Sequence, residues 1–159
     1  MEEVAEQARR ITALIPQIAR NLRLAALFES VRRGLTTTQA MALLILWDAG
    51  RDGLPVGQLA HDLGVSAPTV TGMADRMIDT GMLKRVHSER DRRVVLLRLS
   101  REGHKAAERL GKALEELNTR VLRDMSPETR RVICDAMEQV FEWSQQVRKE
   151  ETVLAGVET

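Results

Sequence analysis

Cysteine and aromatic residues are scarce in this 159-residue chain, which has one cysteine, two phenylalanines, two tryptophans and no tyrosine. A single cysteine, Cys134, excludes a disulfide within the chain. Cys134 falls inside an apolar helical pattern, and because free cysteine is among the most buried residue types, we expect a small core residue there. The alternative is a thiol sensor, which would need exposure and a neighbouring cation; Arg130 and Arg131 are the cations within about one helical turn.

The chain also lacks the long apolar segment that a membrane protein needs. No apolar run approaches the ~20 residues of a membrane span. Glu2, Glu3 and Glu6 make the N-terminus acidic where a signal peptide is basic. We therefore expect a cytoplasmic protein that has no membrane partner.

Motifs for catalysis and metal binding are missing as well. The sequence has no glycine-rich phosphate loop, no Ser/His/Asp set, no Cys/His pair and no two-cysteine metal motif. Its three histidines, His61, His87 and His104, are far apart and lack the spacing of a ligand pair. We predict that the protein is not an enzyme, holds no metal or cofactor, and carries these histidines as surface or capping residues.

Charge is nearly balanced overall, at +1, but it is unevenly distributed. Residues 51–100 include eight basic and six acidic residues, whereas residues 126–159 include four basic and seven acidic residues. The middle of the chain is therefore the better nucleic-acid surface, and the C-terminal part is the better surface for protein or water.

Apolar residues at helical spacing run from residue 8 to residue 28, and Pro16 interrupts them. A proline inside a helix removes a backbone donor, so we expect either a kink at Pro16 or a short helix followed by a longer one. Thr36 and Gln39 then form a capping box. The apolar run that follows, Ala40 to Trp47, predicts a central helix.

Two short helices are predicted next, over 55–64 and 66–80. Gly64 closes the first at its C-terminal end, and Ser66, followed by Pro68, has the pattern of an N-cap. Short helices joined by a tight turn containing glycine are typical of a helix-turn-helix, whose second helix enters the DNA major groove.

Residues 82–86 and 94–99 have the composition of two strands. Ser100 then caps a further helix, and Ser126 with Pro127 begins the last one, whose apolar stripe covers residues 133–147. The predicted fold class is thus mainly helical with a small β-wing: four helices, a hairpin and two long helices.

The hairpin concentrates positive charge. Lys84 to Ser100 contains six basic and two acidic residues, a net charge of +4. Arg90, Arg92 and Arg93 gather at its tip, where a guanidinium can enter a narrow A·T-rich minor groove. Asp91 can hold one arginine by charge-assisted hydrogen bonds. A solvated charged turn is the alternative interpretation.

The second short helix offers weaker base-reading chemistry, because its leading face lacks Arg, Asn and Gln, the residues of strong bidentate base contacts. Gly72 is unfavourable inside a helix by ~1 kcal/mol, so either DNA approaches the backbone there or another helix packs against it. Arg76 can reach a phosphate or a guanine. The competing interpretation of Arg76 is an ion pair with a neighbouring acid: Asp62, Asp75 or Asp79. The residues predicted to contact DNA are Ser66, Thr69, Thr71, Gly72, Arg76, Arg90, Asp91, Arg92 and Arg93.

Several segments resemble the MarR family of bacterial transcription regulators. Asp91-Arg92-Arg93 followed by Val94 to Ser100 looks like the family's wing signature, Asp-x-Arg, a strand and then Leu-Thr or Leu-Ser opening a helix. Further similarities are Leu35-Thr36 with Gln39, Gln58-Leu59-Ala60 and Gly81-Met82-Leu83-Lys84-Arg85. The resemblance covers nearly the whole chain in order.

The resemblance implies a homodimer of winged helix-turn-helix subunits on a pseudo-palindromic operator. The first and the last two helices would interlock. This divides the chain into a helical dimerisation region, 1–35 and 100–159, and a DNA-binding region, 36–99, within a single intertwined domain. The recognition helix would be 66–80, and Arg93 would enter the minor groove with Asp91 orienting it.

Members of this family often repress genes and release DNA when a small, frequently aromatic, anionic molecule binds. Few aromatic residues are present here to build a stacking cage, and the N-terminal cysteine of peroxide-sensing members is missing. The resulting hypothesis is a sequence-specific regulator that binds double-stranded DNA, a ligand-responsive repressor whose effector the sequence does not identify. Two alternatives stay open: an architectural DNA-binding protein with little sequence preference, and a protein-interaction module.

Overall fold

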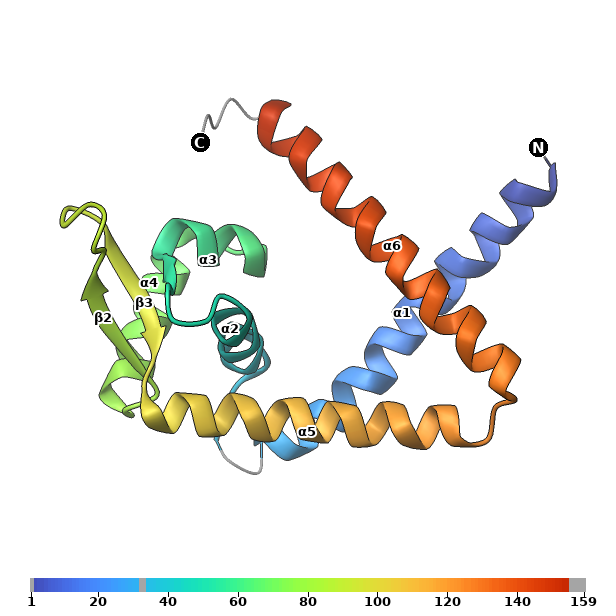
Figure 1. Cartoon of the computed structure of the whole chain (residues 1–159), viewed down its shortest axis with the longest axis horizontal. Helices are drawn as coiled ribbons and strands as arrows, with labels where there is room; N and C mark the ends of the chain where they lie inside the picture. Colours follow the sequence, from blue (N-terminus) through green and yellow to red (C-terminus); the bar gives the residue numbers. More distant parts are fainter. Residues whose placement is uncertain (1, 32–33, 155–159) are drawn as a thin grey trace. The chain divides into compact units, whose positions relative to one another are not determined.

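The computed structural model describes residues 2–31 and 34–154, which form six helices and a three-stranded antiparallel sheet (Figure 1). In chain order the elements are α1 (Glu2–Val31), α2 (Thr37–Asp48), β1 (Leu54–Pro55), α3 (Val56–Leu63), α4 (Ala67–Asp79), β2 (Leu83–His87), β3 (Val95–Leu99), α5 (Arg101–Arg123) and α6 (Pro127–Leu154). They confirm the predicted fold class. The chain divides into two compact units, Met1–Leu117 and Asn118–Thr159. Within the described ranges, no helix combines the length and the apolar character that crossing a membrane requires.

α1 is a single helix that continues through Pro16, so the alternative of two helices separated there is wrong. Pro16 is exposed, and water can therefore satisfy the backbone carbonyl that loses its helical partner. The large apolar side chains of α1 that are exposed are Val4, Ile11, Leu14, Ile15 and Ile18. The side chains of Leu22, Ala25 and Phe28, on the same predicted stripe, lie outside the described residues.

The capping box predicted before α2 is present. The Thr36 hydroxyl accepts the N–H of Gln39 at 3.3 Å, and the Gln39 side chain accepts the N–H of Thr36 at 2.8 Å. Two of the backbone donors that lack a helical partner at the start of α2 are thereby satisfied. α2 is central to the core of its unit, since Ala42, Leu43 and Leu46 are fully buried.

The helix-turn-helix is also confirmed as a local structure. Gly64 ends α3 with φ +66°, a left-handed conformation that costs glycine little. The Ser66 hydroxyl accepts the N–H of Thr69 at 3.4 Å and begins α4. Leu59 of α3 and Met77 of α4 are fully buried in the same apolar cluster, which fixes the outward face of α4.

The sheet has one strand more than the sequence predicted. Its order is β1-β3-β2, and the short strand Leu54–Pro55 pairs antiparallel with Leu97 and Leu96 of β3. This strand was not predicted because two residues are too few to show the alternation of a strand, and because Pro55 has the pattern of a helix start. Strands β2 and β3 each begin one residue later than expected. In their register, Leu83 lies opposite Leu99 and His87 lies opposite Val95.

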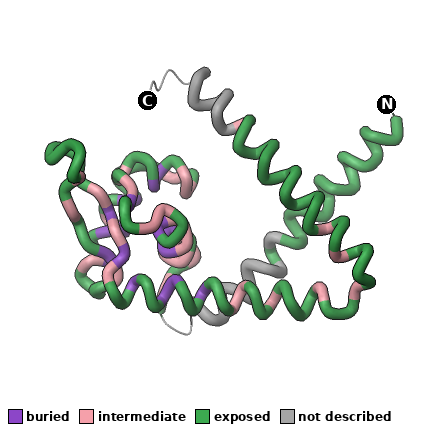
Figure 2. Tube along the Cα trace, in the orientation of Figure 1, coloured by how far each residue is buried: buried purple, intermediate pink, exposed green. Residues whose placement is uncertain are grey.

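Buried positions gather in α2, α3, α4, the sheet and the start of α5, whereas the described parts of α1 and α6 are almost entirely exposed (Figure 2). Leu97 and Leu99 contribute one face of β3 to the core, and Ala106, Ala107 and Leu110 contribute the first turns of α5. The half-buried Leu96 and Arg98 alternate with the buried Leu97 and Leu99, as expected of a strand with one face on a core.

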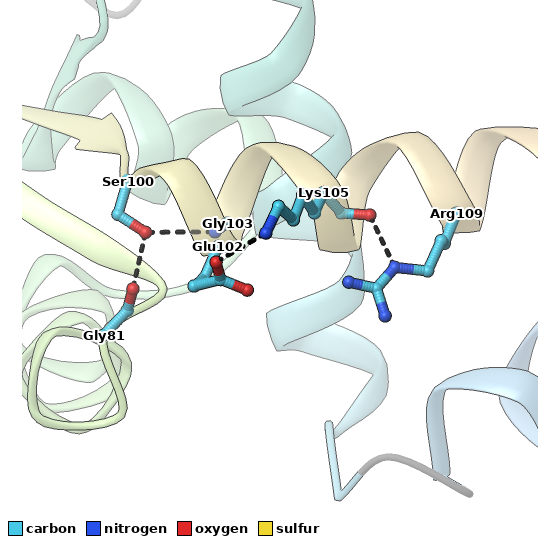
Figure 3. Close-up of polar contacts among 6 residues, drawn as sticks. All are labelled: Gly81, Ser100, Glu102, Gly103, Lys105 and Arg109. Carbon is cyan, nitrogen blue, oxygen red and sulfur yellow. Dashed lines mark hydrogen bonds and ion pairs between the residues drawn. The ribbon is translucent and has the colours of Figure 1, made fainter.

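Ser100 joins the start of α5 to the turn between α4 and β2 (Figure 3). Its hydroxyl donates to the carbonyl of Gly81 and accepts the N–H of Gly103 at 3.0 Å, so the predicted N-cap of α5 is confirmed. Within α5, Lys105 donates to Glu102 at 2.9 Å. This hydrogen bond, and then the charge of Lys105, lower the pKa of the Glu102 carboxyl.

Gly103 has no room for a side chain, because a Cβ there would lie 2.0 Å from the backbone carbonyl oxygen of Met82. That carbonyl also accepts the N–H of Ser100 at 2.9 Å. We expect Gly103→Ala to lower the free energy of unfolding by about 2–3 kcal/mol, measured by urea denaturation. Gly111→Ala is the matched control, because a Cβ there meets nothing within 4 Å, and it should stabilise the helix by up to about 1 kcal/mol. Equal stabilities for the two variants would contradict the close approach.

α6 forms most of the second unit and begins as predicted. The Ser126 hydroxyl accepts the N–H of Thr129 at 3.2 Å. The prediction of a buried Cys134 is wrong, since this residue is exposed. The helical pattern placed Cys134 beside apolar residues, but Met137, Val140 and Phe141 are themselves exposed by more than half, so the pattern marks an open face rather than a core.

Candidate nucleic-acid interface

The first turns of α4 form one part of the candidate interface. Val70, Met73, Ala74 and Met77 are buried, so their side of the helix faces the core. The residues on the remaining surface that were predicted to contact DNA are Ser66, Thr69, Thr71 and Arg76, all exposed, and the half-buried Gly72. All five therefore lie outside the buried side of α4, on its N-cap and its first turns.

The hydroxyl groups of α4 already have intramolecular partners, which limits what they can offer DNA. Ser66 Oγ and Thr69 Oγ1 lie 2.8 Å apart and share one proton, leaving one hydroxyl proton of the pair for a phosphate. Thr71 Oγ1 donates to the carbonyl of Ala67 at 3.0 Å, so in this rotamer its oxygen can only accept. A phosphate cannot donate to it, whereas the amino group of adenine or cytosine can.

Gly72 has open space beside it. A Cβ at this position would meet only the Arg76 side chain, at 3.8 Å. The prediction that another helix packs against Gly72 is therefore wrong among the described residues. The other interpretation, a close approach of the helix backbone to DNA, stays a prediction.

The ion pair predicted for Arg76 is also absent among the described residues, and Asp75, one of its three predicted partners, pairs with Arg85 instead. Arg85 lies on β2, and its Nη2 is 2.6 Å from Oδ1 of Asp75 on α4. Both side chains are about half exposed, so water screens the pair and its worth is below about 1 kcal/mol. The pair still connects the wing to the recognition helix, and Arg76 makes no ion pair with any described residue. No local spacing marks Arg85 as the partner of Asp75.

The hairpin of β2 and β3 forms the other part of the interface, and its tip lies at the far end from α5 (Figure 1). Short polar side chains organise this tip. The Ser88 hydroxyl accepts the N–H groups of Arg90 and Asp91 at 3.2 and 3.4 Å, while Asp91 Oδ1 accepts the N–H of Arg93 at 2.9 Å. Such side-chain turns mimic a backbone turn.

Asp91 thus differs from its predicted role. We expected its carboxylate to hold an arginine side chain, and the structure shows it bound to the Arg93 backbone instead. A carboxylate two residues before an N–H is well placed for this local bond. Among the described residues Asp91 forms no ion pair with a guanidinium.

Arg90, Arg92 and Arg93 are exposed, and none forms an ion pair with a described residue. Three positive charges lie within four residues and repel one another, and the carboxylates of Glu89 and Asp91 offset them only in part. A bound polyanion would relieve this repulsion, and the arginines would release counterions that are condensed on the polyanion. The tip therefore has the charge and the accessibility that a DNA-binding wing requires.

The three histidines lie apart on the surface. His61, His87 and His104 are all exposed, as predicted. The His104 ring meets Trp47 edge-on, with centroids 5.6 Å apart, and Nδ1 of His87 lies 2.8 Å from the Arg92 carbonyl. Across the part of the chain that the structure describes, no three His, Cys, Asp or Glu residues gather as metal ligands would.

Comparisons with known proteins agree with this geometry. The family described as "MarR family" matches residues 35–95, which run from before α2 to the start of β3. The uncharacterised HTH-type transcriptional regulator YfiV of Bacillus subtilis is 27% identical over 134 residues, covering 84% of this chain and 82% of YfiV.

Solved structures show the same fold over nearly the whole chain. A MarR family protein from Bacillus stearothermophilus matches with a TM-score of 0.79 and 25% identity, covering 89% of this chain and 97% of that protein. MepR of Staphylococcus aureus bound to ethidium matches with a TM-score of 0.62 and 19% identity, covering 82% of this chain and 94% of MepR. A MepR mutant bound to an oligodeoxyribonucleotide matches with a TM-score of 0.60 and 19% identity, covering 82% and 95%.

Proposed function

Since the chain belongs to the MarR family of winged helix-turn-helix transcription regulators and is not an enzyme, we propose that it represses transcription as a homodimer bound to a pseudo-palindromic operator. Each subunit places α4 in a major groove and its wing tip in the adjacent minor groove. A small molecule releases the dimer from DNA. The protein acts in the cytoplasm, where its DNA is.

The observation that carries this proposal is the wing tip. Its backbone is fixed by Ser88 and Asp91, while Arg90, Arg92 and Arg93 are exposed and unpaired among the described residues. A structural turn would gain nothing from three repelling charges, whereas a DNA-binding wing uses them for affinity and for reading a narrow minor groove.

The homodimer is supported by exposed apolar surface. α1 and α6 each expose large apolar side chains along their length, and surfaces of this kind on a soluble protein mark interaction sites. In this proposal residues 1–35 and 100–159 form the dimerisation region and residues 36–99 the DNA-binding region. Two recognition helices about 34–36 Å apart would then read two half-sites one helical turn apart.

The proposed response to a small molecule rests on relatives. MepR has been solved with an oligodeoxyribonucleotide and with ethidium, so one fold accommodates both kinds of ligand. Repression follows when a dimer occupies an operator that overlaps a promoter, and a ligand that favours the unbound form of the dimer releases it. The identity of the effector is left open.

Selection of bound fragments from the source genome tests the function. We expect a pseudo-palindromic sequence to be enriched and to bind at least about 10³-fold more tightly than bulk DNA at fixed salt. An architectural protein would enrich no sequence, and an equal mass of bulk DNA would displace it from any selected fragment. A protein-interaction module would bind neither the selected fragments nor bulk DNA.

A further inference from the structure

The peptide that joins Arg92 to Arg93 is bound at both of its polar ends. Its carbonyl oxygen, on Arg92, accepts a hydrogen bond from Nδ1 of His87 at 2.8 Å. Its N–H, on Arg93, donates to Oδ1 of Asp91 at 2.9 Å. A carbonyl oxygen only accepts, so Nδ1 of His87 carries the proton.

This peptide controls the direction of two wing arginines at once. A peptide unit is planar, so fixing its carbonyl and its N–H fixes the plane between the α-carbons of Arg92 and Arg93. The α-carbons from which both side chains leave are thereby fixed, which restricts the directions that those side chains can take. We propose that His87 is a positioning residue for DNA recognition, which together with Asp91 clamps this peptide so that Arg92 and Arg93 point into the groove. The inference rests on the proposed function.

His87 is well suited to this task because it belongs to the strand and not to the tip. It is the last residue of β2 and lies opposite Val95 of β3. Ser88 binds the first half of the tip, at Arg90 and Asp91. Among the described residues, His87 alone connects the second half of the tip to β2 by a side chain.

Stability alone does not account for this contact. His87 is exposed and takes no part in the buried apolar cluster. A hydrogen bond between exposed groups adds little to the free energy of unfolding, because water replaces it. Its effect falls on the conformation of the tip, where long arginine side chains turn a small change of backbone direction into a large displacement of the guanidinium.

The test compares His87→Leu, which removes the donor, with His87→Asn, whose side-chain amide can donate from a similar distance along the chain. We expect His87→Leu to weaken operator binding about 5-fold for each wing, the worth of one ordinary hydrogen bond. His87→Asn should recover most of this loss. Binding to bulk DNA should change by less than about 2-fold in both variants, because every arginine is retained. His61→Leu is the matched control, since His61 is exposed and its side chain makes no hydrogen bond with a described residue.

Two further measurements separate the clamp from other roles of His87. Asp91→Ala and His87→Leu should be non-additive in operator affinity, because both act on one peptide. Amide hydrogen exchange over residues 88–94 of the free protein should rise in His87→Leu and stay near the parent rate in His87→Asn.

The clamp is overturned if His87→Leu binds the operator as tightly as the parent, if His87→Asn fails to recover the loss, or if bulk DNA binding falls equally. If the parent itself shows no preference for any operator, the proposed function fails. Amide hydrogen exchange over residues 88–94 of the free protein still tests the clamp in that case, because it does not depend on DNA binding.

Discussion

Arg93→Ala is expected to weaken operator binding by about 1–3 kcal/mol for each wing, and thus by about 2–6 kcal/mol for a dimer with two wings. Arg93 is exposed and its guanidinium makes no ion pair with a described residue, so no intramolecular contact has to be broken before DNA binds. Its backbone N–H is held by Asp91. Titration of a labelled operator at fixed salt measures the loss.

The variant Arg93→Lys tests whether Arg93 contacts the minor groove or the phosphate backbone. A lysine retains the charge and would serve almost equally on a phosphate, but its compact, strongly hydrated ammonium enters a narrow groove less readily. We expect the lysine variant to lose most of what the alanine variant loses. Arg109→Ala is the control for charge alone, because Arg109 lies on α5 and donates to the carbonyl of Lys105 at 2.9 Å. An unchanged dissociation constant for Arg93→Ala would remove the wing from the mechanism.

The helix boundaries could be predicted because their signals are local. Each N-cap requires a hydroxyl three residues before a backbone N–H, and this spacing is visible in the sequence. The caps at Thr36, Ser66, Ser100 and Ser126 are all present. The positive charge of the wing was equally visible, since it depends on composition and not on packing.

What could not be predicted depends on contacts between distant residues. Nothing near Leu54 indicates that it pairs with Leu97. The ion pair of Asp75 with Arg85 connects a helix to a strand across a turn, and it engages one of the three local partners proposed for Arg76. Periodicity revealed an apolar stripe around Cys134 but not whether another element covers it, and in the chain that residue is exposed.

At the wing tip, the sequence predicted where the charges lie but not which atoms interact. An acid among arginines suggests an ion pair, yet the Asp91 carboxylate binds a backbone N–H two residues away. A local bond of this kind costs less conformational entropy than fixing a long guanidinium side chain. His87 was classified as a surface or capping residue, and its bond to the Arg92 carbonyl depends on the hairpin register.

The exposed face of α6 leads to the last prediction, which concerns assembly. Met137 and Phe141 are one turn apart on this helix and are 63% and 62% exposed. The double substitution Met137→Asp with Phe141→Asp should therefore leave the fold of the single chain intact. If this face is buried between two subunits, four carboxylates would enter the interface without partners, which strongly disfavours association.

We expect this double variant to be monomeric at low micromolar concentration by light scattering, where the parent is dimeric. Its operator affinity should fall by about 10²–10⁴-fold, because a monomer occupies one half-site and loses the high effective concentration of the second. Gln139→Asp is the matched control, since position 139 lies on the opposite side of α6 from Met137 and Phe141 at about 100° per residue, and it should stay dimeric. Circular dichroism must show the same helix content in all three proteins. A double variant that is still dimeric, or a parent that is monomeric, would show that this face of α6 does not join two subunits, and the pairing of two half-sites would need another interface.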